Sequence, residues 1–328
     1  MRVTFYHRRP QGANYSIERL FAEVRRALPR GIDARVAESR FPSRGLWRRV
    51  YNTIEAAFRQ GDVNHITGDV HFLALLLHRR KTLLTIHDLV TVHRLRGLRR
   101  RVLLFFWYWL PIRRSALVTV ISHATREDLL NHVRVDEQKV RVVHDCVSKK
   151  FRPSPKEFAT ARPAILQVGT GHNKNLARVA EALAGIPCHL RIIGLLNAEQ
   201  VAALREHGVE YSAAADISDE SVVDEYRRCD MLVFASTYEG FGLPIVEAQM
   251  TGRPVVTSNI LSMPEVAGGA ACLVDPFDVA SIREGILKVI RDVGYRDDLV
   301  RRGLENAARF RPEIIATQYA GIYRELVG

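Results

Sequence analysis

Two glutamates offer the most specific chemistry in this sequence, and seven residues separate them in the run Glu239-Gly-Phe-Gly-Leu-Pro-Ile-Val-Glu247. The apolar run Met231–Phe234 before them predicts a buried strand, and Pro244 predicts the first position of a helix. Glu247 would lie about one turn into that helix, where a carboxylate could accept hydrogen bonds from two vicinal hydroxyls of a ribose. Glu239 would lie in the loop, where it could accept hydrogen bonds from the hydroxyls of a sugar.

The loop between the two glutamates suits an anion. Gly240 and Gly242 allow the backbone to approach a ligand closely, and the N–H groups at the start of the following helix attract a phosphate. A strand–turn–helix without a ligand explains the same spacing: its glycines would serve the turn and its glutamates would complement the helix dipole. Spacing alone leaves both interpretations open.

Two further loops hold single candidates. Ala164–Val168 predicts a strand and Asn175–Leu183 a helix, so Lys174 lies beside a helix N-terminus, where it could stabilise a leaving diphosphate. His87 ends another predicted strand, Leu83–His87. Taken alone, a lysine after such a turn is more often an ordinary surface residue, and a histidine at a strand end is more often structural.

Taken as a set, these stretches resemble glycosyltransferase family 4, a large group of retaining enzymes with the GT-B fold. The two glutamates match the E-x7-E signature of that family. Further stretches resemble the family in order and spacing: Thr85-Ile-His-Asp-Leu89, Val120–Leu129, Gly252-Arg-Pro-Val-Val256, Met263–Gly268 and Asp275-Pro276. The resemblance covers the chain from Leu83 onward and is weaker before it.

The resemblance implies a role for each candidate. Glu247 would hold the ribose of a nucleotide-sugar, and His87, Lys174 and Glu239 would be the catalytic residues around the donor sugar and its diphosphate. The residues that we expect to bind the donor are Gly12, Thr170, Lys174, Asn175, Ile217, Glu239, Gly240, Phe241, Gly242, Leu243 and Glu247.

The sequence departs from the family in two loops. Thr170 stands where the family usually has an arginine, so we expect Lys174 to carry most of the positive charge there. Gly12 is the one clear counterpart of the family's Gly-rich loop after the first strand, and Asn14 and Tyr15 are weaker candidates in the same loop.

The organisation of the chain predicts an α/β protein with two domains. Short β-branched runs alternate with amphipathic helical stretches in both halves, which is typical of parallel sheets. The Pro-rich segment Ser148–Pro163 predicts the boundary between an acceptor-side domain, 1–150, and a nucleotide-sugar-binding domain, 151–328, whose last helix could return to the first domain. The resemblance implies the GT-B fold, in which two Rossmann-like parallel-sheet domains face each other across a cleft.

Charge divides the chain in the same way. The net charge is +12, but residues 1–150 hold 29 Lys and Arg against 13 Asp and Glu, a net +16, whereas residues 151–328 carry −4. The basic half favours an anionic partner such as acidic lipid or a polyanionic acceptor, although an arginine-rich composition without a partner is equally consistent. No recognised nucleic-acid module is present, so we expect no nucleic acid.

One arginine-rich stretch has two interpretations. Residues 94–114 place arginines on both sides of the apolar run Val102–Leu110. The run could be a helix lying in a membrane interface, with its arginines on lipid phosphates. We favour a buried core helix with solvated ends, since the run is apolar on every side.

Motifs for metals and targeting are missing from the sequence. There is no Asp-x-Asp motif and no His, Asp and Glu group with the spacing of a metal site, so we expect neither a metal nor a cofactor. The four cysteines are scattered, which fits a reducing cytosol, and no signal peptide or bilayer-spanning run is apparent. We expect a cytoplasmic protein, peripheral on the inner face of the membrane if its acceptor lies there.

The sequence therefore predicts a retaining hexosyltransferase of surface polysaccharide biosynthesis. Its expected partners are a nucleotide-sugar, for which family analogy favours GDP-mannose, a glycan or lipid-linked acceptor, and an anionic membrane surface. The alternatives are a GT-B sugar-nucleotide epimerase and a non-catalytic protein that binds a polyanion or membrane on the same fold.

Overall fold

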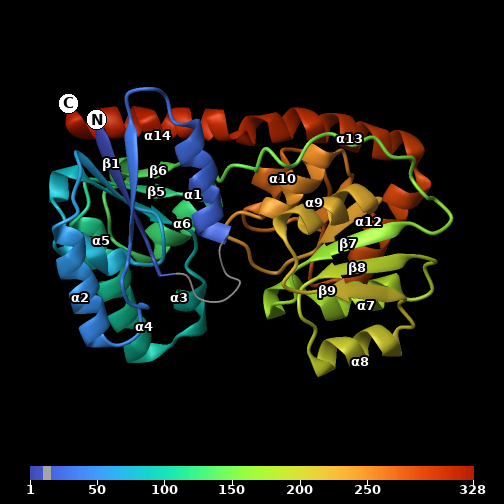
Figure 1. The fold of residues 1–328 in the computed structure, drawn as a ribbon. Coiled ribbons are helices and arrows are strands. Elements are labelled where there is room, and N and C mark those ends of the chain that lie inside the picture. Colours follow the sequence, from blue (N-terminus) through green and yellow to red (C-terminus); the bar gives the residue numbers. More distant parts are fainter. Residues whose placement is uncertain (10–15) are drawn as a thin grey trace. The chain divides into compact units, whose positions relative to one another are not determined.

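The computed structural model describes residues 1–9 and 16–328 and divides into two compact units. Unit 1 comprises Met1–Cys146 and Pro312–Gly328, and unit 2 comprises Val147–Arg311 (Figure 1). The chain thus passes from one unit to the other just before the Pro-rich segment, and its last helix, α14 (Pro312–Val327), belongs to unit 1.

Unit 1 is built on a six-stranded parallel sheet with the strand order β2-β1-β3-β4-β5-β6. Its strands are β1 (Arg2–His7), β2 (Asp33–Glu38), β3 (Val63–Ile66), β4 (Thr82–Ile86), β5 (Leu117–Val120) and β6 (Val140–Val142). Most of their side chains are buried, which explains why they appear in the sequence as short apolar, β-branched runs.

The helices of unit 1 connect these strands. They are α1 (Ser16–Ala27), α2 (Leu46–Ala57), α3 (Val90–Arg94), α4 (Gly97–Leu103), α5 (Leu110–Arg113), α6 (His123–His132) and α14, with the short turns η1 (His71–Leu75), η2 (Arg79–Lys81) and η4 (Glu137–Lys139). Between α4 and α5 the chain forms π-helical turns, η3 (Leu104–Trp109). The expectation of a buried core helix in this stretch is met on one face only. Leu104, Trp107 and Tyr108 pack in or against the core of unit 1, whereas Val102, Phe105 and Phe106 are exposed to solvent.

The C-terminal helix α14 is anchored to the sheet of unit 1 by a buried histidine. His65 of β3 hydrogen-bonds through Nδ1 to the Tyr323 hydroxyl at 2.7 Å and through Nε2 to Thr85 of β4 at 2.7 Å. Burial lowers the pKa of His65 well below its usual value, so the ring is neutral and can donate through one nitrogen while it accepts through the other. Tyr319 and Phe5 pack around it.

Unit 2 repeats this architecture with the strand order β12-β11-β10-β7-β8-β9, again parallel. Its strands are β7 (Ala164–Val168), β8 (His189–Ile193), β9 (Tyr211–Ala214), β10 (Met231–Phe234), β11 (Val255–Ser258) and β12 (Cys272–Val274). Its helices are α7 (Leu176–Leu183), α8 (Ala198–Glu206), α9 (Asp219–Arg228), α10 (Leu243–Thr251), α11 (Met263–Ala267), α12 (Val279–Arg291) and α13 (Val293–Ala307), with the turns η5 (His172–Lys174) and η6 (Ala308–Phe310).

Both sheets reverse the direction in which strands are added. In unit 1 the chain places β2 on one side of β1 and β3 on the other; in unit 2 it places β8 on one side of β7 and β10 on the other. The loops that leave the central pair of strands diverge there, which opens a crevice at the carboxyl ends of the strands. We therefore expect the candidate site residues at these two positions.

No helix in the part of the chain that the structure describes is both long enough and apolar enough to span a lipid bilayer.

The close contact between α12 and the sheet of unit 2 can be tested by adding a methyl group at a glycine of the helix. A Cβ on Gly285 would lie 2.4 Å from Cγ1 of Val274, so we expect Gly285→Ala to lower the free energy of unfolding by about 1–3 kcal/mol through overpacking. Gly321, in α14, has no neighbour within 4 Å of an added Cβ, and Gly321→Ala should stabilise by about 0.5–1 kcal/mol. Thermal unfolding of both variants checks this, and equal shifts would contradict the close packing at Gly285.

Candidate functional site

An ion pair lies at the strand reversal of unit 2. Lys174 follows β7 and Glu239 follows β10, and these two strands are neighbours. The Lys174 Nζ and Glu239 Oε1 atoms are 2.6 Å apart, with 19% and 14% of the two side chains exposed. Both residues were predicted from the sequence to be catalytic, and the fold brings them together in a partly buried position open to a ligand.

The backbone before Lys174 is shaped to hold its side chain. Gly169 has a φ of +86°, and a Cβ there would lie 2.9 Å from Cε of Lys174, so only glycine fits. The ammonium also lies 4.5 Å from the centre of the Phe234 ring, where the negative face of the ring attracts it. The cation is therefore held by one carboxylate and one aromatic ring.

The loop that carries Glu239 is fixed from two sides. Asn173 donates from Nδ2 to the Tyr238 carbonyl at 2.9 Å and to Glu239 Oε1 at 3.2 Å. The Ser262 hydroxyl donates to the carbonyls of Glu239 and Phe241 at 3.0 and 2.9 Å. Four hydrogen bonds thus fix the geometry of the loop that carries Glu239.

Asn175 has a structural task that the sequence did not reveal. Its Nδ2 donates to the carbonyl oxygens of Ala235, at 3.0 Å, and Pro276, at 2.7 Å, and the buried residue adopts a φ of +60° just before α7. The side chain ties three loops together. Both N–H groups of the side-chain amide are used in these two hydrogen bonds. Neither is therefore available for the direct contact with the nucleotide-sugar that the sequence predicts.

The helix α10 begins beside the ion pair. Gly242 is its N-cap with a φ of +101°, and Leu243 is its first residue, so Pro244 occupies the second position rather than the predicted first. The first N–H groups of a helix have no partner within the helix and carry a partial positive charge. Gly240 lies in the loop before this terminus, and Phe241 is buried against Phe310.

Glu247 accepts a hydrogen bond that spacing along the chain could not predict. The Tyr226 hydroxyl, from α9, donates to Glu247 Oε2 at 2.5 Å. Burial raises the pKa of Glu247 to about 7, while the Tyr226 hydrogen bond and the positive charge of Lys174 act in the opposite direction. Burial also raises the pKa of Tyr226 well above 10, so the tyrosine remains a donor.

Two further predicted donor-binding residues are Thr170, in the loop after β7, and Ile217, in the loop after β9. The Thr170 hydroxyl donates to the Leu195 carbonyl at 2.7 Å, and Gln200 Nε2 donates to the Thr170 carbonyl at 2.7 Å, which joins this loop to the one after β8. Ile217 is half-buried in the loop between β9 and α9. The loops after β7, β9 and β10 therefore contribute predicted residues, and the loop after β8 contacts one of them.

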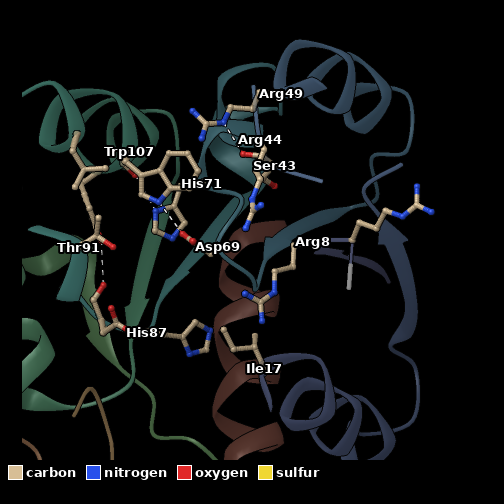
Figure 2. A pocket seen from close by; sticks show the side chains of 14 residues that line it. Arg8, Ile17, Ser43, Arg44, Arg49, Asp69, His71, His87, Thr91 and Trp107 are labelled. Carbon is tan, nitrogen blue, oxygen red and sulfur yellow. Dashed lines mark hydrogen bonds between the residues drawn. The ribbon is translucent and has the colours of Figure 1, made fainter. Parts of the chain in front are cut away.

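A second candidate site is a cavity in unit 1, about 520 Å³ in volume, at the strand reversal of that sheet (Figure 2). Arg8 follows β1, Asp69 and His71 follow β3, and His87 follows β4. His87 Nε2 bonds to the Thr67 carbonyl at 2.8 Å. The predicted catalytic histidine thus lines this cavity, whereas Lys174 and Glu239 belong to unit 2.

Helical segments wall the rest of the cavity. Figure 2 shows Trp107 of η3 beside His71 and Asp69: its indole Nε1 donates to Asp69 Oδ1 at 2.8 Å, and its carbonyl bonds to His71 Nδ1 at 2.9 Å. The guanidinium of Arg49, from α2, lies 5.0 Å from the Trp107 ring centre. Arg8, Arg9 and Arg44 also line the cavity, which gives it a strongly basic wall that the sequence analysis did not identify.

Three other predicted residues, Gly12, Asn14 and Tyr15, lie outside the described residues.

Within residues 1–9 and 16–328, one group of side chains has the arrangement of a metal site. Ligand atoms of His93, Asp128 and His132 lie within 4.8 Å of one another. Spacing along the chain did not reveal the group because His93 lies on α3, far in sequence from the two residues on α6. Hydrogen bonds explain why these three side chains lie close together. His93 Nε2 bonds to both carboxylate oxygens of Asp128, at 2.8 and 3.0 Å, and His132 Nδ1 donates to the backbone carbonyl of Asp128 at 2.7 Å.

Comparison with known proteins agrees with this geometry. Residues 2–150 match the model of "Glycosyltransferase Family 4", and residues 148–306 match that of "Glycosyl transferases group 1". Anabaena Alr3699/HepE, solved in complex with UDP and glucose, is similar with a TM-score of 0.80 at 16% identity, covering 99% of this chain and 100% of that one. This likeness shows that the chain has the GT-B fold.

Two mannosyltransferases are among the similar sequences. The O-antigen chain mannosyltransferase B of Escherichia coli is 42% identical over 110 residues, 34% of this chain and 29% of that protein. The O-antigen chain mannosyltransferase RfbU of Salmonella typhimurium is 24% identical over 248 residues, 73% of this chain and 67% of that protein. The chain thus aligns with less than a third of the length of the first of these relatives.

The raised pKa of Glu247 predicts a pH dependence of stability. The folded protein binds this proton more tightly than the unfolded chain, so the stabilisation is complete below the unfolded value of 4.5 and is lost as pH rises through about 7. Relative to Glu247→Gln, the wild type should lose about 3 kcal/mol between these pH values. Thermal unfolding across this range measures the difference.

A further variant serves as the control. Tyr226→Phe removes the hydrogen bond that lowers the pKa of Glu247, so it should steepen the pH dependence rather than abolish it. Parallel pH profiles for the wild type and Glu247→Gln would show that Glu247 does not titrate in this window.

Proposed function

Because the chain belongs to the family 4, group 1 glycosyltransferases, we propose that it transfers a hexose from a nucleotide-sugar to a glycan or lipid-linked acceptor in surface polysaccharide biosynthesis. The observation that carries the proposal is the 2.6 Å pair of Lys174 and Glu239 at the strand reversal of unit 2, beside the start of α10. This pair joins a cation suited to a diphosphate to a carboxylate suited to sugar hydroxyls.

Each residue of the pair has a distinct part in the proposed donor complex. The Lys174 ammonium and the N–H groups at the start of α10 face the diphosphate, where they stabilise the charge that develops as the bond to the sugar breaks. Glu239 accepts hydrogen bonds from hydroxyls of the hexose. When the diphosphate enters, Lys174 exchanges part of its contact with Glu239 for the phosphate oxygens, which frees the carboxylate for the sugar.

Glu247 is proposed to hold the ribose. Two carboxylate oxygens can accept from two vicinal hydroxyls, and Oε2 already accepts from Tyr226 at 2.5 Å. The tyrosine fixes the plane of the carboxylate, so we assign it a positioning role. The ionised carboxylate is the better acceptor, and nearby Lys174 favours that form.

The proposed reaction retains the configuration of the sugar. The acceptor hydroxyl attacks the anomeric carbon on the face that the diphosphate leaves, the bond between that carbon and the phosphate oxygen breaks, and the hydroxyl proton passes to the leaving oxygen. We assign no protein nucleophile. His87, which follows β4 in unit 1, is proposed to border the donor sugar because the resemblance to the family implies that role.

GDP-mannose is the donor that we favour. The support is the two relatives named as mannosyltransferases, together with the Gly-Thr and Lys-Asn loop at 169–175, which some family members share. UDP and glucose, named for Anabaena Alr3699/HepE, make UDP-glucose the necessary comparison. We propose that no metal is needed, because Lys174 and the α10 terminus supply the charge that a divalent cation would otherwise provide.

A panel of donors tests the function. We expect the purified protein, with EDTA present, to release GDP from GDP-mannose faster than it releases nucleotide from UDP-glucose or other nucleotide-sugars. A sugar-nucleotide epimerase would instead return an isomerised sugar, and a non-catalytic binding protein would release nothing. Loss of activity with EDTA that Mg²⁺ restores would contradict the metal-independent scheme.

Lys174→Ala should lower turnover by about 100- to 1,000-fold, as loss of a donor to developing negative charge does elsewhere. Lys288→Ala is the matched control, because Lys288 also packs its ammonium on an aromatic ring of unit 2, Tyr295, at 4.0 Å. Steady-state kinetics with the preferred donor measures both variants. Unchanged turnover in Lys174→Ala would remove the lysine from the mechanism.

A further inference from the structure

The cluster of His93, Asp128 and His132 in unit 1 has the composition of a transition-metal site. Two imidazoles and one carboxylate are a ligand set that proteins use for Zn²⁺, with water at the fourth position. The three ligand atoms lie within 4.8 Å of one another. Two of the three ligands are imidazole nitrogens, which suit Zn²⁺ and not Mg²⁺ or Ca²⁺, because the latter ions take oxygen ligands.

The distances between the ligand atoms are close to those around a bound Zn²⁺ ion. With zinc–ligand bonds of about 2.0–2.1 Å, neighbouring ligand atoms of a tetrahedral site lie about 3.3 Å apart. Asp128 Oδ2 lies 2.8 Å from His93 Nε2, and Asp128 Oδ1 lies 3.2 Å from His132 Nδ1. A single carboxylate thus contacts one nitrogen of each imidazole at nearly the separation that a shared metal requires.

The backbone that carries the cluster is anchored in the core of unit 1. Val92, Leu129 and Val133 are each adjacent in sequence to one of the three candidate ligands, and all three are at most 4% exposed and belong to one apolar cluster. Asp128 and His132 are four residues apart on α6, so they lie on the same face of that helix. The core therefore holds the candidate ligands at fixed positions, as a metal site requires.

Both imidazoles can present a lone pair toward Asp128. A neutral imidazole carries its proton on either of its two nitrogens. The proton of His93 can thus move to Nδ1 and that of His132 to Nε2, which leaves His93 Nε2 and His132 Nδ1 as metal ligands. Zn²⁺ would then replace the hydrogen bonds that these two nitrogens now make to Asp128. The ion and the hydrogen bonds are alternatives, so binding is reversible and follows the Zn²⁺ concentration.

The cluster is open to solvent and connected to the basic cavity of unit 1. The side chain of His93 is 41% exposed and those of Asp128 and His132 are each 17% exposed, so an ion can enter and keep a water ligand. His93 lies on α3, a helix of five residues whose position depends on its contacts with the rest of unit 1. Thr91 of the same helix lines the cavity (Figure 2).

We propose that His93, Asp128 and His132 bind one Zn²⁺ ion, which ties α3 to α6 and stiffens the wall of the cavity that α3 provides. The ligands are His93 Nε2, His132 Nδ1 and a carboxylate oxygen of Asp128, with water as the fourth. The ion has no part in the proposed transfer reaction, which needs no metal, and the inference does not rest on the proposed function.

Titration of the full chain with ZnCl₂, after treatment with EDTA and its removal, tests the inference. Calorimetry should show one Zn²⁺ bound per chain, and Zn²⁺ should raise the Tm, whereas Mg²⁺ at the same concentration should do neither. Co²⁺ in place of Zn²⁺ should give the visible absorption of a tetrahedral ion. Hydrogen exchange should slow in residues 88–94 and 123–133 when Zn²⁺ is added.

Two variants and one control assign the site. Asp128→Asn keeps the shape of the side chain and removes its charge, and His93→Gln removes the most exposed ligand without a change in α6; each should weaken Zn²⁺ binding about 100-fold. The matched control replaces His123 and His144 by glutamine. These two form another histidine pair of unit 1, with ring centres 6.3 Å apart, and one of them also lies on α6. The control should bind Zn²⁺ as the wild type does.

Several results would overturn the inference. These are a wild type that does not bind Zn²⁺, an equal loss of binding in the control, unchanged binding in both Asp128→Asn and His93→Gln, and a Co²⁺ complex without tetrahedral absorption. Release of GDP from GDP-mannose, measured with EDTA present, reports on the proposed function alone. Failure of the zinc site and failure of the transferase are therefore detected separately.

Discussion

The parallel sheets impose the constraint on which both candidate sites depend. All strands of a parallel sheet end at one edge, and a sheet that grows first to one side and then to the other separates two loops at the point of reversal. In unit 2 these are the loops after β7 and β10, which carry Lys174 and Glu239. In unit 1 they are the loops after β1 and β3, which carry Arg8 and Asp69. The same topology, with different residues, yields an acidic and basic pair in one unit and an arginine-rich cavity in the other.

The ion pair of unit 2 stabilises two charges that the fold partly removes from water. A lysine held in a partly buried position loses hydration, and the carboxylate beside it offsets that cost. Gly169, Asn173 and Phe234 hold the two charges from the protein side, so little rearrangement remains for binding. Preorganised charges of this kind stabilise a developing negative charge better than water, which must reorient. The positions of the two charges are therefore fixed mainly by the loops around them.

The elements of the fold could be predicted largely from apolar periodicity, and the loops of the site from their motifs. β9 and β12 were not predicted, because both lie at edges of the sheet: β9 is short and rich in serine and alanine, and β12 has only three residues. Tyr226 was missed because it meets Glu247 through tertiary packing of α9, for which no spacing rule exists. Asn175 was predicted to bind the donor, but the sequence did not reveal that its side chain also bonds to two distant carbonyls and so holds the loops together. Contacts between elements, rather than within them, account for each of these differences.

The orientation of α2 shows the limit of periodicity most clearly. A four-residue repeat of Leu46, Val50, Ile54 and Phe58 predicts a helix with an apolar stripe, and the usual inference turns that stripe toward the core. The hydrogen bonds of Asn52 to Phe41 fix the opposite orientation, because unpaired amide groups would be costly to bury elsewhere. Each exposed aromatic side chain then forgoes about 25 cal/mol of stabilising free energy for every Å² of apolar surface that remains in contact with water. A helix that folds in this orientation keeps its apolar stripe exposed along the outer face, although the repeat alone would have placed that stripe against the core.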